Sequence, residues 1–271
     1  MSYVSEHPIS HEDRPIRAAG FPEMWQPVHE KYRPFFEATI RMYAVVNEMR
    51  ERNLPEHLAQ VVGRMVFVAL NTYGAIQTLV LNGYGPDAVK LSRSIYEAEV
   101  NIIWLKSHPE DLRDFLDYHF IKQKELYGAM DEEHQSHFSE EQHKQMMAEY
   151  NAVLPRFASK RDQTRPRNEW CRESFYTRAK EAQHEPLYRA FYRPVSSMVH
   201  GDIAGLMAQL DGESSVDTPP SFKSLDDALV NGHGSLVRCL SHFDEIAHLG
   251  FKDRLSELHS DYAAAVKSLS V

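Results

Sequence analysis

Apolar residues recur at every third or fourth position along most of the chain, whereas no useful stretch alternates strictly between apolar and polar residues. The first pattern is typical of amphipathic helices, and the second would indicate half-buried strands. We therefore expect an all-α protein, an up-and-down bundle of several helices without a sheet. Short connections between successive apolar segments favour antiparallel packing of neighbouring helices.

Proline, glycine and capping residues divide this pattern into segments. We expect a polar N-terminal arm over residues 1–27 and one helical domain over residues 28–271. The helices predicted within this domain cover residues 29–52, 55–81, 86–107, 109–133, 139–153, 169–192, 194–210, 225–248 and 252–269. Two segments lack an apolar period and are expected to be loops, the basic segment 155–168 and the Gly- and Pro-containing segment 211–224.

Composition places the chain among ordinary globular proteins, because 42% of its 271 residues are apolar and 25% are charged. Two cysteines, Cys171 and Cys239, are too few for a disulfide framework and favour a reducing compartment. The N-terminal arm has no apolar run of the kind that a secretory signal needs. The stretch between Met65 and Asp87 is long enough to span a membrane, but its amide side chains favour a buried helix. We expect a cytoplasmic protein without a membrane segment.

A net charge of −9 argues against a general attraction to polyanions. A local basic cluster nevertheless lies in and around the expected loop 155–168 and is suited to contacts with a nucleic-acid backbone. The residues assigned to such contacts are Arg156, Lys160, Arg161, Arg165 and Arg167. The cluster is compatible with RNA as a partner, and no motif for sequence-specific DNA recognition accompanies it.

The helix expected over residues 86–107 is apolar on two opposite sides, which is typical of a buried helix. Arg93 and Glu97 lie four residues apart on it, with Tyr96 on the same face as Arg93, so the two charged groups can pair. Burying either charge alone would be costly. Two interpretations stay open: an ion pair that fixes helix register, or a guanidinium and a carboxylate that line a pocket. Glu99 is expected to point elsewhere and to face solvent.

The segment 192–202 carries the second polar constellation. On one continuous helix, Arg193 and His200 would lie within about 20° of each other around the axis, with Ser196 on nearly the same strip. Pro194 favours an extended Arg193 just before the helix begins. Arg can clamp a phosphate, and His can move a proton to or from a ribose hydroxyl or leaving oxygen. The alternative is a structural His200 that is hydrogen-bonded to Ser196 or to a buried carboxylate.

These residues resemble a broad bacterial family of all-helical proteins of unknown function. The resemblance rests on Arg93-Ser94-x-x-Glu97 in a helix after Gly85-Pro86, followed by Tyr192-x-x-x-Ser196-x-x-x-His200-Gly201. It covers about residues 63–210, and it is moderately specific because several features appear in the same order. It implies a helical fold and no established activity.

The spacing from Arg193 to His200 is also similar to the Arg-x(4–6)-His motif of HEPN-domain ribonucleases. Those proteins are helical and often dimeric, and they cut RNA without metal in toxin–antitoxin and phage-defence systems. The resemblance implies that Arg193 and His200 are catalytic and that the chain forms a homodimer. It departs from the usual pattern at Pro194, where a polar residue commonly follows the Arg.

Metal and cofactor chemistry find little support in the sequence. Three Glu-x-x-His pairs of the di-iron kind occur, at Glu140/His143, Glu181/His184 and Glu245/His248. They are only a small excess over chance, and Glu245 falls opposite an apolar stripe. A Gly-rich phosphate loop and a Gly-x-Ser-x-Gly elbow are both missing. We expect no metal site and no cofactor.

Two hypotheses remain. The first is a metal-independent protein that cleaves or binds RNA through Arg193 and His200. The supporting residues would be Arg93, Tyr96, Glu97, Ser196 and Asp202. The second is a non-catalytic helical module that binds a small ligand or a partner protein in a polar cleft around the same residues.

Overall fold

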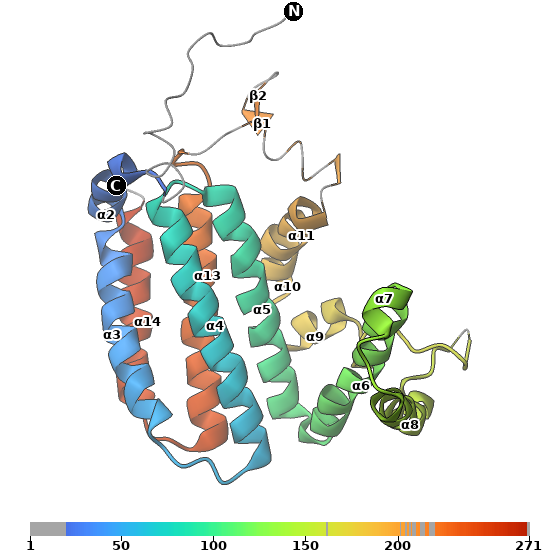
Figure 1. The fold of residues 1–271 in the computed structure, drawn as a ribbon. Helices are drawn as coiled ribbons and strands as arrows, with labels where there is room; N and C mark the ends of the chain where they lie inside the picture. The colour runs from blue at the N-terminus through green and yellow to red at the C-terminus, as the bar shows by residue number, and fades with distance from the viewer. Residues whose placement is uncertain are drawn as a thin grey trace, which may run out of the picture. The chain divides into compact units, whose positions relative to one another are not determined.

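The fold is taken from a computed structural model, which describes residues 20–160, 162–200, 202–203, 205, 207, 210–211, 215–216 and 220–269. The prediction of an all-α protein is confirmed, because helices pack against one another throughout (Figure 1). The chain divides into two compact units. Unit 1 comprises residues 1–102 and 184–271, and unit 2 comprises residues 103–183. The prediction of one domain stays a prediction, since compactness does not decide whether unit 2 folds alone.

Unit 1 is built from long helices joined by short connections. Its helices are α2 (Pro22–Lys31), α3 (Arg33–Arg50), α4 (His57–Leu81), α5 (Gly85–Ser107, whose last turn belongs to unit 2), α10 (Glu185–Leu187), α11 (Arg193–His200), α13 (Leu225–Ala247) and α14 (Lys252–Ser268). Helix α13 packs against α4 and α14, and α14 packs against α3 (Figure 1). Buried residues lie on all sides of α13, as expected for the central helix of a bundle.

Helix α4 is the one described helix that is long and apolar enough to cross a membrane by length and composition alone. Its buried residues include Val62, Val66, Tyr73 and Ile76, which follow the spacing of one helix face. That face packs against α13. The packing favours the predicted core helix, and the cytoplasmic location stays a prediction.

The beginning of unit 1 differs from the predicted arm. Helix α2 begins at Pro22, inside the segment that was expected to be irregular, while residues 1–19 lie outside the described residues. The Asn82 side chain explains why a helix begins here, because its Oδ1 accepts hydrogen bonds from Phe21 N (2.8 Å) and Trp25 Nε1 (2.9 Å). These contacts are long-range, so the local pattern alone does not predict them.

Unit 2 is a smaller group of shorter helices. Its elements are η1 (Pro109–Asp111), α6 (Leu112–Ala129), α7 (Glu132–Gln135), α8 (Glu140–Phe157) and α9 (Phe175–Glu181). Helix α6 packs against α8. Ser139 begins α8 with a capping box, as its side chain accepts from Gln142 N and its own N–H donates to the Gln142 side chain.

Two predicted boundaries in unit 2 are wrong. Helix α8 continues through Pro155 to Phe157, so the segment 155–168 is a loop only from Ala158 onward. The fully buried Phe157 ring contacts Tyr118 at 5.3 Å between centroids, and this packing outweighs the backbone donor lost at Pro155. The helix expected from residue 169 begins at Phe175 instead.

The segment 211–224 is described only in part. The two-residue strands β1 (Leu210–Asp211) and β2 (Ser215–Val216) pair antiparallel, with Leu210 opposite Val216. This short ladder is a small departure from the expectation of a fold without a sheet. It leaves the all-α class unchanged.

Candidate functional site

The predicted pair on α5 forms and includes a third residue. Arg93 lies 2.9 Å from Glu97 Oε1, four residues along the same helix. Tyr192 completes the group, because its hydroxyl donates to Glu97 Oε1 at 2.9 Å and accepts from Arg93 at 3.2 Å. The Arg93 guanidinium also lies 4.9 Å from the centre of the Tyr192 ring. Arg93, Glu97 and Tyr192 thus form one polar cluster.

A π-helical turn, η2 (Tyr188–Tyr192), presents Tyr192 to this cluster. Arg193 N donates to the carbonyl of Tyr188, five residues back, which is the bonding pattern of a π-turn. The wider turn stacks the Tyr188 and Tyr192 rings at 5.1 Å between centroids. Tyr96 lies against the same ring at 5.6 Å. Burial, reinforced by the Glu97 carboxylate, raises the pKa of Tyr192 to about 12, so the phenol stays neutral and can donate.

The expectation that Glu99 faces solvent is wrong. Glu99 is fully buried and is bound by Arg238 of α13, with Arg238 Nε 2.5 Å from Oε1 and the guanidinium NH2 group 3.1 Å from Oε2. His184 Nδ1 lies 3.3 Å from Glu99 Oε1 without making a hydrogen bond. Burial lowers the pKa of His184 although Glu99 opposes the shift, so the imidazole is neutral near pH 7. Tyr96 joins this layer by donating to the His184 carbonyl at 3.3 Å.

The residues predicted on the following helix lie along α11. Arg193 and His200 occupy the two ends of α11 and are exposed, while Ser196 is half-buried. Seven residues of helix separate the two end positions by about 10.5 Å along the axis. Among the described residues, no hydrogen bond or ion pair joins Arg193, Ser196 or His200 to Arg93 or Glu97.

Two details of α11 differ from expectation. Arg193 is helical, with φ −61° and ψ −51°, rather than extended before Pro194. The preceding π-turn explains this, because it already holds Arg193 in helical geometry before Pro194, which lacks a backbone donor. Asp202 is used locally, since its Oδ1 accepts from Gly205 N at 2.8 Å.

The basic residues of unit 2 divide into two groups. Arg156 binds the carboxylates of Asp114 and Asp117, and Arg167 donates to the backbone carbonyls of Glu169, Arg156 and Trp170. Lys160 and Arg165 are exposed, with Arg165 3.4 Å from Asp162. Arg161 lies outside the described residues. Two of the predicted backbone-binding cations are therefore engaged in holding unit 2 together.

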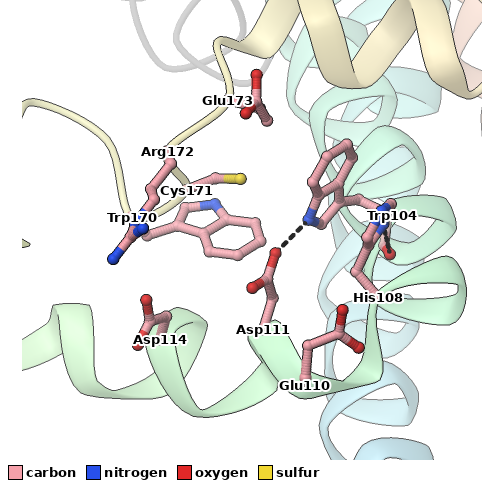
Figure 2. Close-up of a pocket in the computed structure, with 9 residues that line it drawn as sticks. All are labelled: Trp104, His108, Glu110, Asp111, Asp114, Trp170, Cys171, Arg172 and Glu173. Atoms are coloured by element: carbon pink, nitrogen blue, oxygen red, sulfur yellow. Dashed lines mark hydrogen bonds between the residues drawn. The ribbon is translucent and has the colours of Figure 1, made fainter. Parts of the chain in front are cut away.

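Unit 2 contains a hollow of about 400 Å³ that the sequence did not predict (Figure 2). We call it the tryptophan hollow. Its lining residues are Trp104, His108, Glu110, Asp111, Asp114, Trp170, Cys171, Arg172 and Glu173. Local contacts position its walls. His108 stacks on Trp104 with centroids 3.9 Å apart, and Phe115 meets the Trp170 ring edge-on at 5.1 Å.

The polar groups of the tryptophan hollow are unevenly satisfied. Asp111 Oδ2 accepts from Trp104 Nε1 at 2.8 Å, and Asp114 Oδ1 binds Arg156 at 2.7 Å. Among the described residues, Glu110, Asp111 and Glu173 have no ion-pair partner. The hollow therefore has a negative lining.

Cys171 projects its sulfur into the space between the two indole rings (Figure 2). Burial raises the pKa of this thiol, so it is protonated at neutral pH and is a poor nucleophile. The described residues contain no group of three or more His, Cys, Asp or Glu side chains placed to hold a metal ion. The hollow therefore offers aromatic rings, carboxylates and a protonated thiol, together with His108, whose Nε2 lies 3.3 Å from Glu181 Oε1.

Comparison with known proteins identifies a family. Residues 59–217 match DUF5677, a family of unknown function. The chain belongs to this family. No curated protein and no solved structure matches the chain significantly.

The DUF5677 region contains the Arg93–Glu97–Tyr192 cluster, helix α11 and the whole tryptophan hollow. It agrees with the predicted membership of a helical family of unknown function, whereas the ribonuclease resemblance and the bacterial origin stay predictions. Sequence reasoning missed the hollow because its two tryptophans lie 66 positions apart by number, and no local spacing connects them. The available signal was weak: acidic residues follow each of the two tryptophans within seven positions.

Proposed function

We propose that this DUF5677 protein is a non-catalytic helical module that binds a small molecule in the tryptophan hollow. One observation carries the proposal. Two nearly buried indole rings share a hollow of about 400 Å³ with three carboxylates that lack ion-pair partners among the described residues. Small-molecule sites commonly have this composition, an apolar or aromatic lining with a few polar groups that orient the ligand.

The Arg93–Glu97–Tyr192 cluster supports a structural interpretation instead. Arg93, Glu97 Oε1 and the Tyr192 hydroxyl are bonded to one another at 2.9–3.2 Å. A ligand of these groups would compete with these internal bonds. The bonding favours the role in which the ion pair fixes how η2 packs on α5.

Fluorine NMR provides a direct test, because the chain has three tryptophans. We would label the full chain with 5-fluorotryptophan and screen a library that contains cationic, neutral and anionic metabolites. A bound ligand is expected to shift the Trp104 and Trp170 resonances and to leave Trp25, an exposed residue of α2, unchanged. Single Trp→Phe variants would assign the three signals. The proposal is refuted if no compound of any class moves Trp104 or Trp170 selectively.

RNA cleavage by Arg193 and His200 is kept as a second candidate. One observation favours it: both side chains are exposed on one helix, where a nucleic acid can reach them. The test compares wild type with His200→Ala on total RNA without added metal. The matched control is His57→Ala, which removes an exposed histidine at the beginning of α4. Equal cleavage by wild type and His200→Ala, or none by either, would end this hypothesis.

A further inference from the structure

We infer that the ligand of the tryptophan hollow is an organic cation. Such a molecule would contain an ammonium group and, a few bonds away, a hydrogen-bond acceptor. The inference rests on the proposed function and adds the chemical class of the ligand. Three features support it: the charge of the lining, the two indole rings, and an indole N–H without a partner among the described residues.

The charge of the lining selects a cation. Glu110, Asp111 and Glu173 have no ion-pair partner among the described residues, while Asp114 is bound by Arg156. Arg172 is the opposing charge in the lining. Like Glu110 and Glu173 it is exposed, but its guanidinium points away from Trp104, beyond the Trp170 ring (Figure 2). Carboxylates attract a cation and repel a phosphate or carboxylate ligand, and the effect grows as water is excluded.

The indole rings select an organic cation over a hydrated metal ion. Trp104 and Trp170 both line the hollow, and their indole carbons give it apolar surface beside the carboxylates. Trp170 already accepts a cation within the protein, because the Arg178 guanidinium lies 4.9 Å from its centre. A weakly hydrated ammonium group with methyl or methylene carbons gains from both the ring faces and the carboxylates.

The Trp170 indole supplies the polar group that would orient the ligand. The residue is more than nine-tenths buried, and its Nε1 has no hydrogen-bond partner among the described residues. In Figure 2 this nitrogen lies on the edge of the ring that faces Cys171. A buried indole N–H usually finds an acceptor. A hydroxyl or carbonyl oxygen on the ligand would provide it.

The size of the hollow limits the ligand to a compact molecule. Its volume of about 400 Å³ is near the lower end of the range of small-molecule sites. A trimethylammonium or primary ammonium group with a short polar chain fits within this volume. A folded peptide or an RNA strand does not.

Calorimetry on the full chain tests whether the ligand must be positively charged, using a cation and a neutral molecule of the same shape. The cations are choline, tetramethylammonium and spermidine, and the neutral control is 3,3-dimethylbutan-1-ol, which has the shape and hydroxyl of choline without the charge. We expect choline to bind at least tenfold more tightly than the neutral alcohol. Tetramethylammonium should bind more weakly than choline, because it has no acceptor for the Trp170 N–H.

Two isosteric variants of hollow residues and one control variant test whether choline binds in the hollow. Glu173→Gln and Asp111→Asn each remove one negative charge from the hollow, and each is expected to weaken choline binding about tenfold. The amide introduced by Asp111→Asn retains an oxygen that can accept from the Trp104 indole. Glu141→Gln removes an exposed carboxylate from the first turn of α8 and should leave binding unchanged.

Three outcomes would overturn the inference: the neutral alcohol binds as tightly as choline, both hollow variants bind choline normally, or none of the three cations binds. A neutral or anionic compound that shifts Trp104 and Trp170 in the fluorine experiment would then retain the proposed function while excluding this ligand class. Failure of every compound in that experiment would exclude both.

Discussion

His233 gives the most direct test of how the core of unit 1 responds to pH. The residue is fully buried in α13. Its Nδ1 lies 2.9 Å from the Tyr73 hydroxyl, while its Nε2 is buried without a hydrogen-bond partner among the described residues. The rings of Phe35, Tyr73 and Tyr262 surround it at 5.3–5.9 Å. Protonation would place a charge among these rings.

The magnitude follows from the pKa. Burial lowers the pKa of His233 from 6.5 to about 4. The unfolded chain therefore binds a proton more readily than the folded chain below pH 6.5, and stability is lost as the pH falls from 6.5 toward 4. The full shift is worth about 3 kcal/mol, of which about 2 kcal/mol is lost between pH 7.5 and pH 5. At higher pH the contribution is constant.

The assay is urea unfolding followed by far-ultraviolet circular dichroism at pH 7.5, 6 and 5. The control is His233→Gln, a side chain of similar size that does not titrate and can still bond to Tyr73. Both proteins share the other titrating groups, including His184 and His259, whose pKa values burial also lowers. Wild type should lose about 2 kcal/mol more than the variant over this range. Equal losses would refute the assignment of a buried, neutral His233.

Three further predictions address the polar layers and the thiols. Glu99→Gln leaves Arg238 without its carboxylate and should lower the free energy of unfolding by about 3 kcal/mol, measured by urea unfolding. Tyr192→Phe removes one hydroxyl that is bonded twice, and should cost about 1 kcal/mol in the same assay, a loss too small to unfold the protein. Iodoacetamide at pH 8 should alkylate Cys171 slowly and Cys239 only after unfolding. Burial raises the pKa of the Cys171 thiol and raises that of the Cys239 thiol well above its usual range. Mass spectrometry after timed quenching measures the order of alkylation, and a reversed order would contradict the prediction.

Local geometry explains which parts of the site were predictable. Arg93 and Glu97 are four residues apart on one helix, so their pairing follows from helix geometry and was expected from the sequence. The position of Glu99 was not, because its partner Arg238 is 139 residues away. Tyr192 belonged to the motif that suggested the site, but only the π-turn decides that its hydroxyl, rather than His200, meets Glu97.

The all-α class, the bounds of α4, α5, α13 and α14 to within two residues, and the Arg93–Glu97 pair all followed from the order of residues. These features depend on periodicity, capping and contacts within one helix, which the order of residues specifies directly. Tertiary structure alone decided the burial of Glu99, the use of Arg156 and Arg167 inside unit 2, and the tryptophan hollow. Each of these depends on which distant segment packs against which, and the free energy of that packing comes from the whole core rather than from any short stretch.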